Sequence, residues 1–124
     1  MNFQELEQKI NTSFLELKSN IEKYVSENAN LKIGDVVTCN LGTSIDSYYV
    51  ITSIGFQMRH GIVYYGKKII KSTGEVSYQL MHSDVGIPEN RLSRATLKVK
   101  GKEISRIEES RYFNNNVNIG IGIR

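Results

Sequence analysis

The chain has 124 residues and a mass of 14.1 kDa, which is the size of one small domain and excludes a large multidomain enzyme. Its 16 basic and 13 acidic side chains give a net charge of +3, too small to require a polyanionic partner, although an isoelectric point of about 9.0 allows one. Hydrophobic residues make up 40% of the chain and proline occurs once, so the chain can bury enough apolar surface to fold.

Cysteine usage and hydropathy bear on the compartment. Cys39 is the single cysteine, so no intramolecular disulfide can form, and a reducing compartment is the simpler assumption. No run of 18 uncharged apolar residues occurs, and the first residues lack the basic and apolar regions of a signal peptide. We therefore expect a cytoplasmic protein without a membrane partner. Abundant asparagine, isoleucine, lysine, tyrosine and serine favour an AT-rich source, such as a low-GC bacterium or its phage.

Residues 1–27 predict one amphipathic helix. Its apolar residues recur at spacings of three or four with polar residues between them: Phe3, Leu6, Ile10, Phe14, Leu17, Ile21 and Val25. They fit an 11-residue repeat, whose period of about 3.67 keeps the apolar stripe nearly straight and does not favour a left-handed coiled coil. The centre of the stripe, at Phe14, Leu17 and Ile21, is a candidate assembly surface. The stripe packs either on its own domain or against the same helix of other subunits.

From residue 31 the pattern changes to β-strands. Short runs of β-branched and aromatic residues predict strands at 36–41, 48–54 and 62–71. Gly55 is expected to end the second strand, and Gly66 is expected to mark a bulge in the third.

The second half of the chain continues this β pattern. A returning strand places Val76, Tyr78 and Leu80 on one half-buried face. A short helical turn is expected at 87–92, where the proline suits a helix start, and two further strands are expected around a tight turn at 100–102. One helix followed mainly by antiparallel strands predicts the fold class α+β, mainly β.

Four motifs of the middle of the chain follow one another in a set order. They are Leu31-Lys32-Ile33-Gly34-Asp35-Val36-Val37, Tyr49-Val50-Ile51-Thr52-Ser53-Ile54, a basic hairpin, and Ile87-Pro88-Glu89-Asn90-Arg91-Leu92. In this order the chain resembles the small SH3-like barrels of the KOW and Tudor kind over roughly half of its length. The resemblance implies an SH3-like β-barrel at 31–95 and a binding function rather than catalysis. The helix at 1–27 and a C-terminal β extension at 96–124 depart from a minimal barrel of this kind.

The C-terminal residues alternate between apolar and small or polar without exception. The apolar set of the strand predicted at 117–123 is Val117, Ile119, Ile121 and Ile123. These four β-branched side chains require burial, and neither proline nor lysine protects the strand from edge-to-edge association. We expect this strand to pair outside its own sheet, in another subunit or in a partner protein. The alternative is that it closes its own sheet.

No motif for catalysis, metal binding or nucleotide binding is present. The residues that could hold a metal ion, Cys39, His60, His82 and Asp84, lack the spacing of a zinc site. No glycine-rich phosphate loop occurs, and nothing near Cys39 supplies a base for a nucleophilic thiol. We therefore expect no enzyme activity, no catalytic residue, no cofactor and no metal site.

Basic residues concentrate in two regions, 59–71 and 91–106, and no acidic residue occurs between 56 and 74. The first region contains the candidate nucleic-acid contacts Arg59, Tyr64, Tyr65, Lys67, Lys68 and Lys71. The second region contains Arg91, Arg94, Lys98, Lys100, Lys102 and Arg106. Basic strands with interleaved tyrosines can follow a phosphate backbone and stack on bases. The alternative is a solvated strand face whose lysines prevent aggregation.

The leading hypothesis is a non-enzymatic protein-binding or assembly module, held in a homo-oligomer or against a partner protein. The alternative is a small nucleic-acid-binding barrel that uses the two basic regions. Both hypotheses place the function on an exposed surface rather than in a catalytic cleft.

Overall fold

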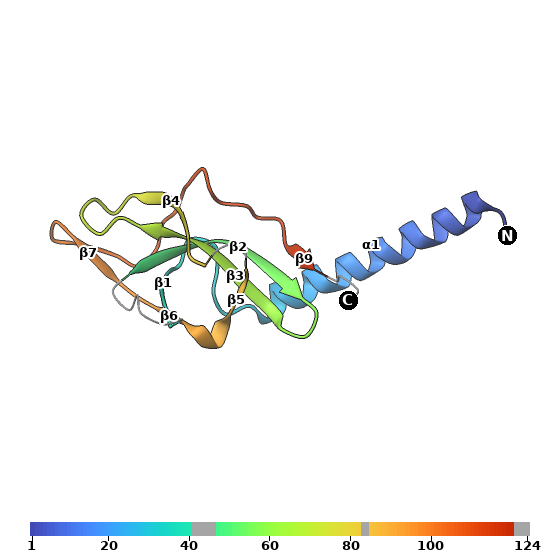
Figure 1. Cartoon of the computed structure of the whole chain (residues 1–124), viewed down its shortest axis with the longest axis horizontal. Coiled ribbons are helices and arrows are strands. Elements are labelled where there is room, and N and C mark those ends of the chain that lie inside the picture. The colour runs from blue at the N-terminus through green and yellow to red at the C-terminus, as the bar shows by residue number, and fades with distance from the viewer. Residues whose placement is uncertain (41–46, 83–84, 121–124) are drawn as a thin grey trace.

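The computed structural model describes residues 1–40, 47–82 and 85–120. One long helix projects from a body of short strands (Figure 1). This helix, α1 (Phe3–Asn28), confirms the helix predicted from the sequence. The side chain of Asn2 accepts a hydrogen bond of 2.8 Å from the backbone N–H of Glu5, as an N-cap residue does. The start of α1 is therefore fixed by its own cap.

The body contains, in the described residues, nine strands and one 3₁₀ turn. They are β1 (Val36–Cys39), β2 (Tyr48–Gln57), β3 (Gly61–Ile69), β4 (Val76–Leu80), β5 (Ile87–Pro88), η1 (Glu89–Arg91), β6 (Leu92–Arg94), β7 (Leu97–Val99), β8 (Lys102–Ile104) and β9 (Asn118–Gly120). The main sheet has the order β4-β3-β2-β1-β6, with β5 paired to β3 and β9 paired to β2. β7 and β8 form a separate antiparallel hairpin. The fold class is therefore α+β and mainly β, as predicted.

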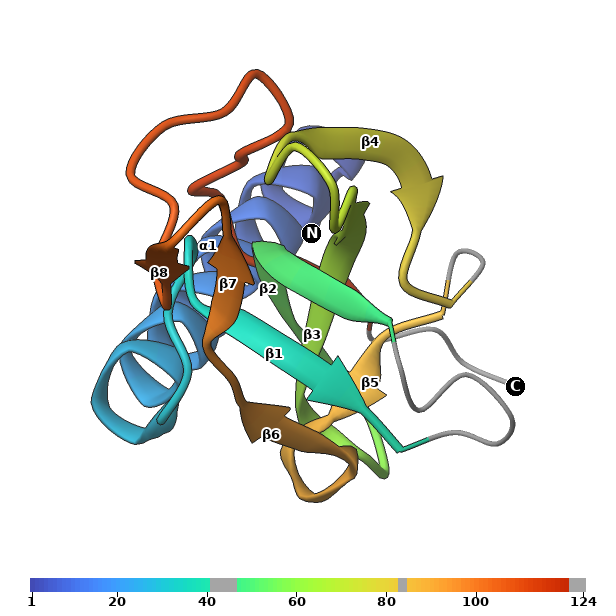
Figure 2. The same cartoon turned by 90° about the vertical axis from the view of Figure 1, so that its left-hand side faces the viewer.

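Two clusters of apolar side chains form the core. Figure 2 shows how the strands of the body curve around its interior. The first cluster contains Leu31, Val37, Tyr49, Ile51, Tyr64, Met81, Ile87 and Leu92. The second contains Val36, Val50, Ile69, Leu97 and Val99. Neighbouring residues of β1 and β2 belong to different clusters, because successive side chains of a strand point to opposite faces. β7 contributes Leu97 and Val99 to the second cluster. The segment that follows β6 therefore shares a core with β1, β2 and β3.

β2 runs through a glycine that the sequence predicts as its end. The strand continues past Gly55 to Gln57, so this prediction was wrong. A Cβ atom at Gly55 would lie 2.7 Å from the backbone oxygen of Asn118. The glycine therefore permits the close approach of β9 and does not make a turn.

The predicted bulge lies on the strand opposite Gly66. The pairing of β2 with β3 shifts between Ile51 and Ser53, so the extra residue belongs to β2. A Cβ atom at Gly66 would lie 2.6 Å from the backbone oxygen of Val50. Gly66 is therefore required for close strand packing, and its assignment as the bulge was wrong.

Two turns confirm predictions from the sequence. The 3₁₀ turn η1 lies within the predicted helical turn at 87–92. β7 and β8 are joined through Lys100 and Gly101, whose φ angles are 51° and 81°. Two consecutive left-handed residues match the twist of a two-residue hairpin turn.

β4 does not bury the apolar face predicted for it. Tyr78 and Leu80 are 76% and 44% exposed, and Val76 alone of the three packs against a core cluster. β4 is the end strand in the sheet order, paired with β3 along one edge. The face that carries Tyr78 and Leu80 is therefore open to solvent.

The C-terminal strand pairs within its own sheet, so the prediction of pairing outside it was wrong for the described residues. β9 runs parallel to β2. β1 and β9 pair with the same edge of β2, opposite the edge that pairs with β3. β1 pairs with the first part of this edge, and β9 pairs with the later part. Val117 and Ile119 are half-buried in this arrangement. Ile121 and Ile123 lie outside the described residues.

Candidate assembly interface

The last two turns of α1 anchor the helix on the body. Ile21 and Val25 are buried. The Tyr24 ring meets the Phe56 ring of β2 edge to face, with 6.0 Å between the ring centres. The prediction that the stripe packs on its own domain is therefore confirmed for this end of the helix. We call these last two turns, residues 21–28, the root.

A hydrogen-bond network holds the chain where α1 joins the body. Asn30 donates two hydrogen bonds to the Glu89 carboxylate, from its backbone N–H at 3.2 Å and from its side-chain amide at 2.8 Å. The Tyr64 hydroxyl donates to the same carboxylate at 2.8 Å and accepts a longer bond, of 3.4 Å, from the Leu31 N–H. Arg94 donates to the Asn30 carbonyl. These bonds fix the direction in which α1 leaves the body.

The environment of this network sets the charge of its two titratable groups. Burial raises the pKa of Tyr64 to about 12, and the hydrogen bond to Glu89 acts in the same direction. Burial acts to raise the pKa of Glu89 as well, but the bonds donated by Asn30 and Tyr64 outweigh it and hold that pKa below its ordinary value. At neutral pH Tyr64 is therefore a neutral donor and Glu89 a charged acceptor.

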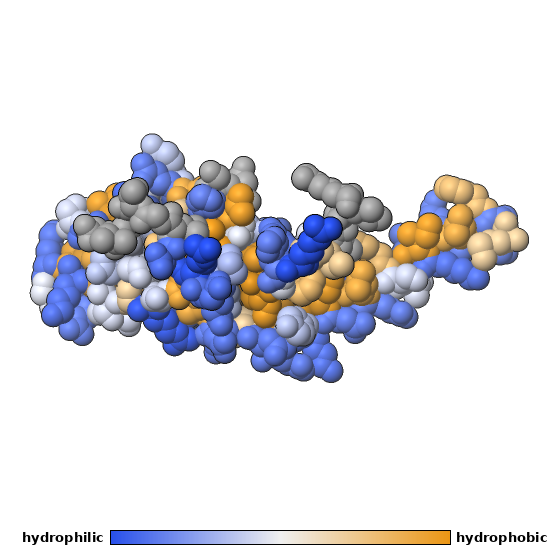
Figure 3. Space-filling model, turned by 60° about the horizontal axis from the view of Figure 1, so that its bottom comes forward, coloured by the Kyte–Doolittle hydropathy of each residue, from blue (hydrophilic) through white to orange (hydrophobic). Residues whose placement is uncertain are grey.

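The first four turns of α1 leave the apolar stripe exposed. We call residues 3–18 the arm. Its five stripe residues each keep between 45 and 74% of their surface exposed: Phe3, Leu6, Ile10, Phe14 and Leu17. Figure 3 shows apolar residues along the projecting helix. Because the 11-residue repeat keeps the stripe straight, the face that packs on the body at the root continues uncovered along the arm.

The structure divides the predicted assembly residues between the two ends of α1. Ile21 is buried in the root, whereas Phe14 and Leu17 are exposed on the arm. Leu15 is also 62% exposed, but it lies about 130° around the helix from the stripe and is not part of it. Periodicity predicts one continuous stripe and contains no signal for where the body stops covering it.

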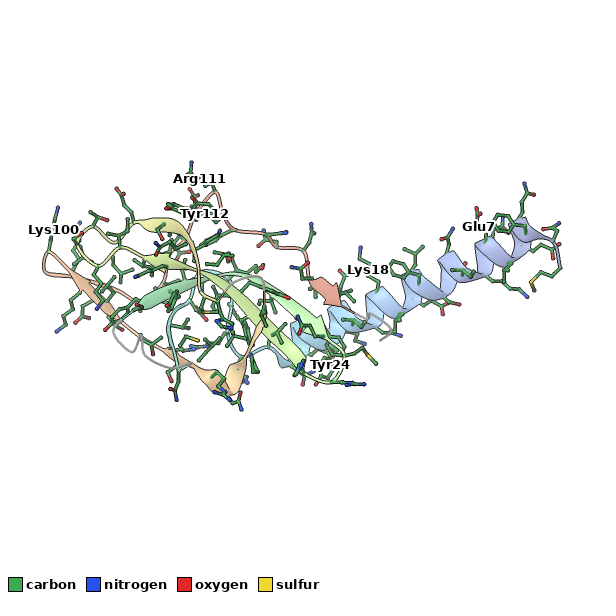
Figure 4. The ribbon with its side chains drawn as sticks, in the orientation of Figure 1. Glu7, Lys18, Tyr24, Lys100, Arg111 and Tyr112 are labelled. Atoms are coloured by element: carbon green, nitrogen blue, oxygen red, sulfur yellow. The ribbon has the colours of Figure 1, made fainter. Side chains whose placement is uncertain are left out.

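Charged side chains flank the stripe of the arm. Glu7 and Lys18, eleven residues apart, point to the same side of α1 (Figure 4). Lys18 Nζ lies 3.9 Å from a carboxylate oxygen of Glu22, and both side chains are about half exposed. Exposed pairs of this kind stabilise a helix by only a few tenths of a kcal/mol. One flank of the stripe therefore carries one charge of each sign.

The predicted nucleic-acid residues do not form one surface. Tyr64 is fully buried and its hydroxyl is bonded to Glu89, so its assignment as a stacking residue was wrong. Val63 and Tyr64 are consecutive and both buried, so β3 is covered on both faces at this point. Exposed and buried residues therefore do not alternate here. Tyr65 is half-buried, and its hydroxyl accepts a hydrogen bond of 3.2 Å from the Gln57 amide.

The basic side chains of the same region separate into two places. Arg59 lies in the turn between β2 and β3. Lys67 and Lys68 lie near the other end of β3, and Lys71 follows that strand. The structure therefore keeps the three lysines near one another and leaves Arg59 apart.

Residues that the sequence analysis missed surround Lys67. Its Nζ lies 5.0 Å from the centre of the Tyr112 ring and donates a hydrogen bond of 3.0 Å to the Tyr78 carbonyl. The Arg111 guanidinium also lies 5.0 Å from the Tyr112 ring, and both residues are labelled in Figure 4. Tyr112 is distant in sequence from Lys67, so no local pattern could have joined them.

A hollow lies beside these lysines. It has a volume of about 560 Å³, and its lining includes Lys68, Lys71 and the exposed Tyr78. Lys71 Nζ lies 5.7 Å from the centre of the Tyr48 ring. Lys67 and Lys68 are consecutive in β3 and pair with Val50 and Tyr49, so their side chains leave opposite faces of the strand. We call the residues at the hollow, Lys68, Lys71 and Tyr78, the basic surface.

Two arginines of the second basic region hold the fold together. Arg106 Nη1 lies 2.7 Å from a carboxylate oxygen of Asp35, and Arg106 also donates to the Ile33 carbonyl at 3.0 Å. Arg94 lies 3.8 Å from the other oxygen of Asp35. The Asp35 side chain is only 13% exposed, so these contacts tie the C-terminal segment to the turn before β1. Arg94 and Arg106 of the second basic region are therefore engaged in contacts within the chain.

Among residues 1–40, 47–82 and 85–120, no group of three His, Cys, Asp or Glu side chains is placed to hold a metal ion. Burial raises the pKa of the half-buried Cys39 thiol, against the opposing effect of the Arg91 charge. In the same part of the chain, no helix is long and apolar enough to cross a membrane.

Comparisons with protein-family models, with curated proteins and with solved structures found no match to this chain. The resemblance to small SH3-like barrels therefore stays a prediction.

Proposed function

We propose that this chain is a non-enzymatic assembly module that associates with a second copy of itself through the arm of α1. The observation that carries the proposal is the apolar stripe, which the body covers at the root and leaves exposed on the arm. Contiguous exposed apolar surface marks interaction sites in soluble proteins. Most of the stability of a helix in a protein comes from packing of its apolar face, so a copy that covers the stripe also stabilises the helix.

The body supplies the base from which the arm projects. The network of Asn30, Tyr64 and Glu89 holds the root in one direction, so two arms can meet without first ordering a flexible linker. We propose that the body is an SH3-like barrel of the kind that the sequence resembles. The single, half-buried Cys39 supports a reducing cytoplasmic compartment.

Light scattering of the full chain over a concentration series tests self-association. The wild type should shift reversibly from 14.1 kDa to twice that mass. Leu6→Ser combined with Phe14→Ser should remain monomeric, because both residues are exposed stripe residues of the arm. Leu15→Ser is the matched control, since it removes an exposed leucine outside the stripe. A wild type that stays at the monomer mass, or a double variant that still dimerises, contradicts the proposal.

A second candidate function is binding of single-stranded nucleic acid on the basic surface. It is supported by the hollow that Lys68 and Lys71 line beside the exposed Tyr78. Lysines can follow phosphates while an exposed tyrosine stacks on a base.

Oligonucleotide retention across a salt series tests this second function. Lys68→Glu combined with Lys71→Glu should weaken binding to every sequence and flatten the salt dependence, because phosphate contacts release counterions. Lys9→Glu combined with Lys23→Glu, at two exposed positions of α1 outside both basic regions, is the matched control. No detectable retention of any DNA or RNA at about 50 mM salt excludes this function.

A further inference from the structure

We propose that the two copies pair as antiparallel α1 helices centred on Ile10, an inference that rests on the proposed self-association through the arm. The stripe of the arm is symmetric about this residue. Phe3 and Leu17 each lie seven positions from Ile10, and Leu6 and Phe14 each lie four positions from it. A two-fold axis through Ile10 therefore superposes the stripe of one copy on that of the other.

The symmetric register pairs side chains of complementary size. At a rise of about 1.5 Å per residue, Leu6 of one copy lies level with Phe14 of the second, about 6 Å from the axis. Phe3 lies level with Leu17 of the second copy, about 10.5 Å from the axis. Every phenylalanine of the arm thus meets a leucine, and Ile10 meets its own equivalent. A parallel pair would place each phenylalanine against another phenylalanine instead.

The position of the body favours the antiparallel direction. The stripe faces the body at Ile21 and Val25, so a second helix lying along the stripe must end before it reaches that level. In the register centred on Ile10, the capped first residue of the second α1, Phe3, lies level with Leu17, about one turn short of Ile21. The two arms therefore overlap along the free stripe, and neither runs into the other's body.

A parallel pair in register meets the opposite situation. The root of the second helix would lie level with the root of the first, on the face that β2 already covers through Tyr24 and Phe56. The body of each copy would then occupy the space of the other's root.

The flanking charges also fit the antiparallel pair. An antiparallel two-fold brings the same flank of both helices together, so Glu7 of one copy lies on the side of Lys18 of the second. Their Cα positions differ by about 7.5 Å along the axis, and both side chains lean toward their own N-termini and thus toward each other. In a parallel pair the same two residues lie about 16.5 Å apart along the axis. Symmetry makes two such contacts in each dimer.

Disulfide trapping in a Cys39→Ser background tests the register. Equal amounts of the Leu6→Cys and Phe14→Cys variants are mixed and mildly oxidised, and the linked peptides are identified by mass spectrometry. The expected product joins position 6 to position 14. Equivalent Leu6 positions lie about 12 Å apart along the axis in the antiparallel pair and should not link. Leu15→Cys, on the other side of the helix, is the matched control and should give no product.

A charge exchange measures the same register without altering the stripe. Glu7→Lys and Lys18→Glu should each weaken dimerisation, on the order of threefold to tenfold, because each places two like charges together. The double variant Glu7→Lys, Lys18→Glu should recover wild-type dimerisation, although Lys18→Glu also loses the loose contact with Glu22.

The outcomes separate the two proposals. A wild type that stays monomeric overturns self-association itself. A dimer that links position 6 to position 6, or in which the charge exchange gives no recovery, leaves self-association standing and overturns the antiparallel register.

Discussion

Replacing Phe14 by alanine is expected to weaken self-association strongly while leaving the body intact. Phe14 is 53% exposed in the single chain, so about half of its surface remains to be buried by the second copy. Full burial of such a side chain stabilises by about 1.5 to 3 kcal/mol, and half of it by roughly 0.75 to 1.5 kcal/mol. Two equivalent sites per dimer double the loss to about 1.5 to 3 kcal/mol, which raises the dissociation constant roughly ten- to a hundred-and-fifty-fold.

Sedimentation equilibrium over a range of concentrations measures this change. A thermal melt followed by circular dichroism, at a concentration where both proteins are monomeric, tests the body separately. Its midpoint should stay near the wild-type value because Phe14 lies outside both core clusters. Leu15→Ala removes a similar exposed apolar side chain from the other side of the helix and should leave the dissociation constant unchanged. An unchanged dissociation constant for Phe14→Ala, or an equal loss in both variants, refutes the assignment of the stripe as the interface.

Three further substitutions test the root, the hydrogen-bond network and the C-terminal strand. Ile21→Ala should lower the free energy of unfolding by about 2 to 5 kcal/mol in a denaturant titration, because it removes a buried side chain. The pKa of Glu89 is below its ordinary value of 4.5 in the folded chain, so its stabilisation is present above that pH and lost as the pH falls through the folded-state pKa. Glu89→Gln should therefore make the fall in stability below about pH 4.5 shallower, and an unchanged acid profile contradicts this. Gly55→Ala should displace β9, because the new Cβ would lie 2.7 Å from the Asn118 oxygen; amide exchange at Ile119 should then become faster, and unchanged exchange contradicts the close approach.

Local patterns predicted the elements that depend on neighbours in sequence. The spacing of apolar residues predicted α1, and runs of β-branched residues predicted β1, β2 and β3. The turn at Lys100 and Gly101 follows from the conformations that a two-residue hairpin requires. The helical turn at η1 likewise forms within a few residues of its proline.

Features that depend on distant contacts could not be predicted in this way. The alternation at 117–123 predicts a strand, but β2, the parallel partner of β9, lies far away in sequence. Tyr64 carries the same local signal as an exposed tyrosine between basic residues, and its burial follows from Glu89 and Leu31 packing over it. The free part of the helix stripe depends on how far the body extends along α1, which no periodicity encodes.

Amide hydrogen exchange of the arm at several protein concentrations tests most directly whether a second copy covers the stripe. If the arms pair, the amides of residues 3–17 should exchange more slowly as the concentration rises, because association stabilises the helix. The amides of β2, which belong to the body, should exchange at the same rate throughout and provide the internal reference. Exchange of the arm that is fast and independent of concentration would contradict self-association through α1.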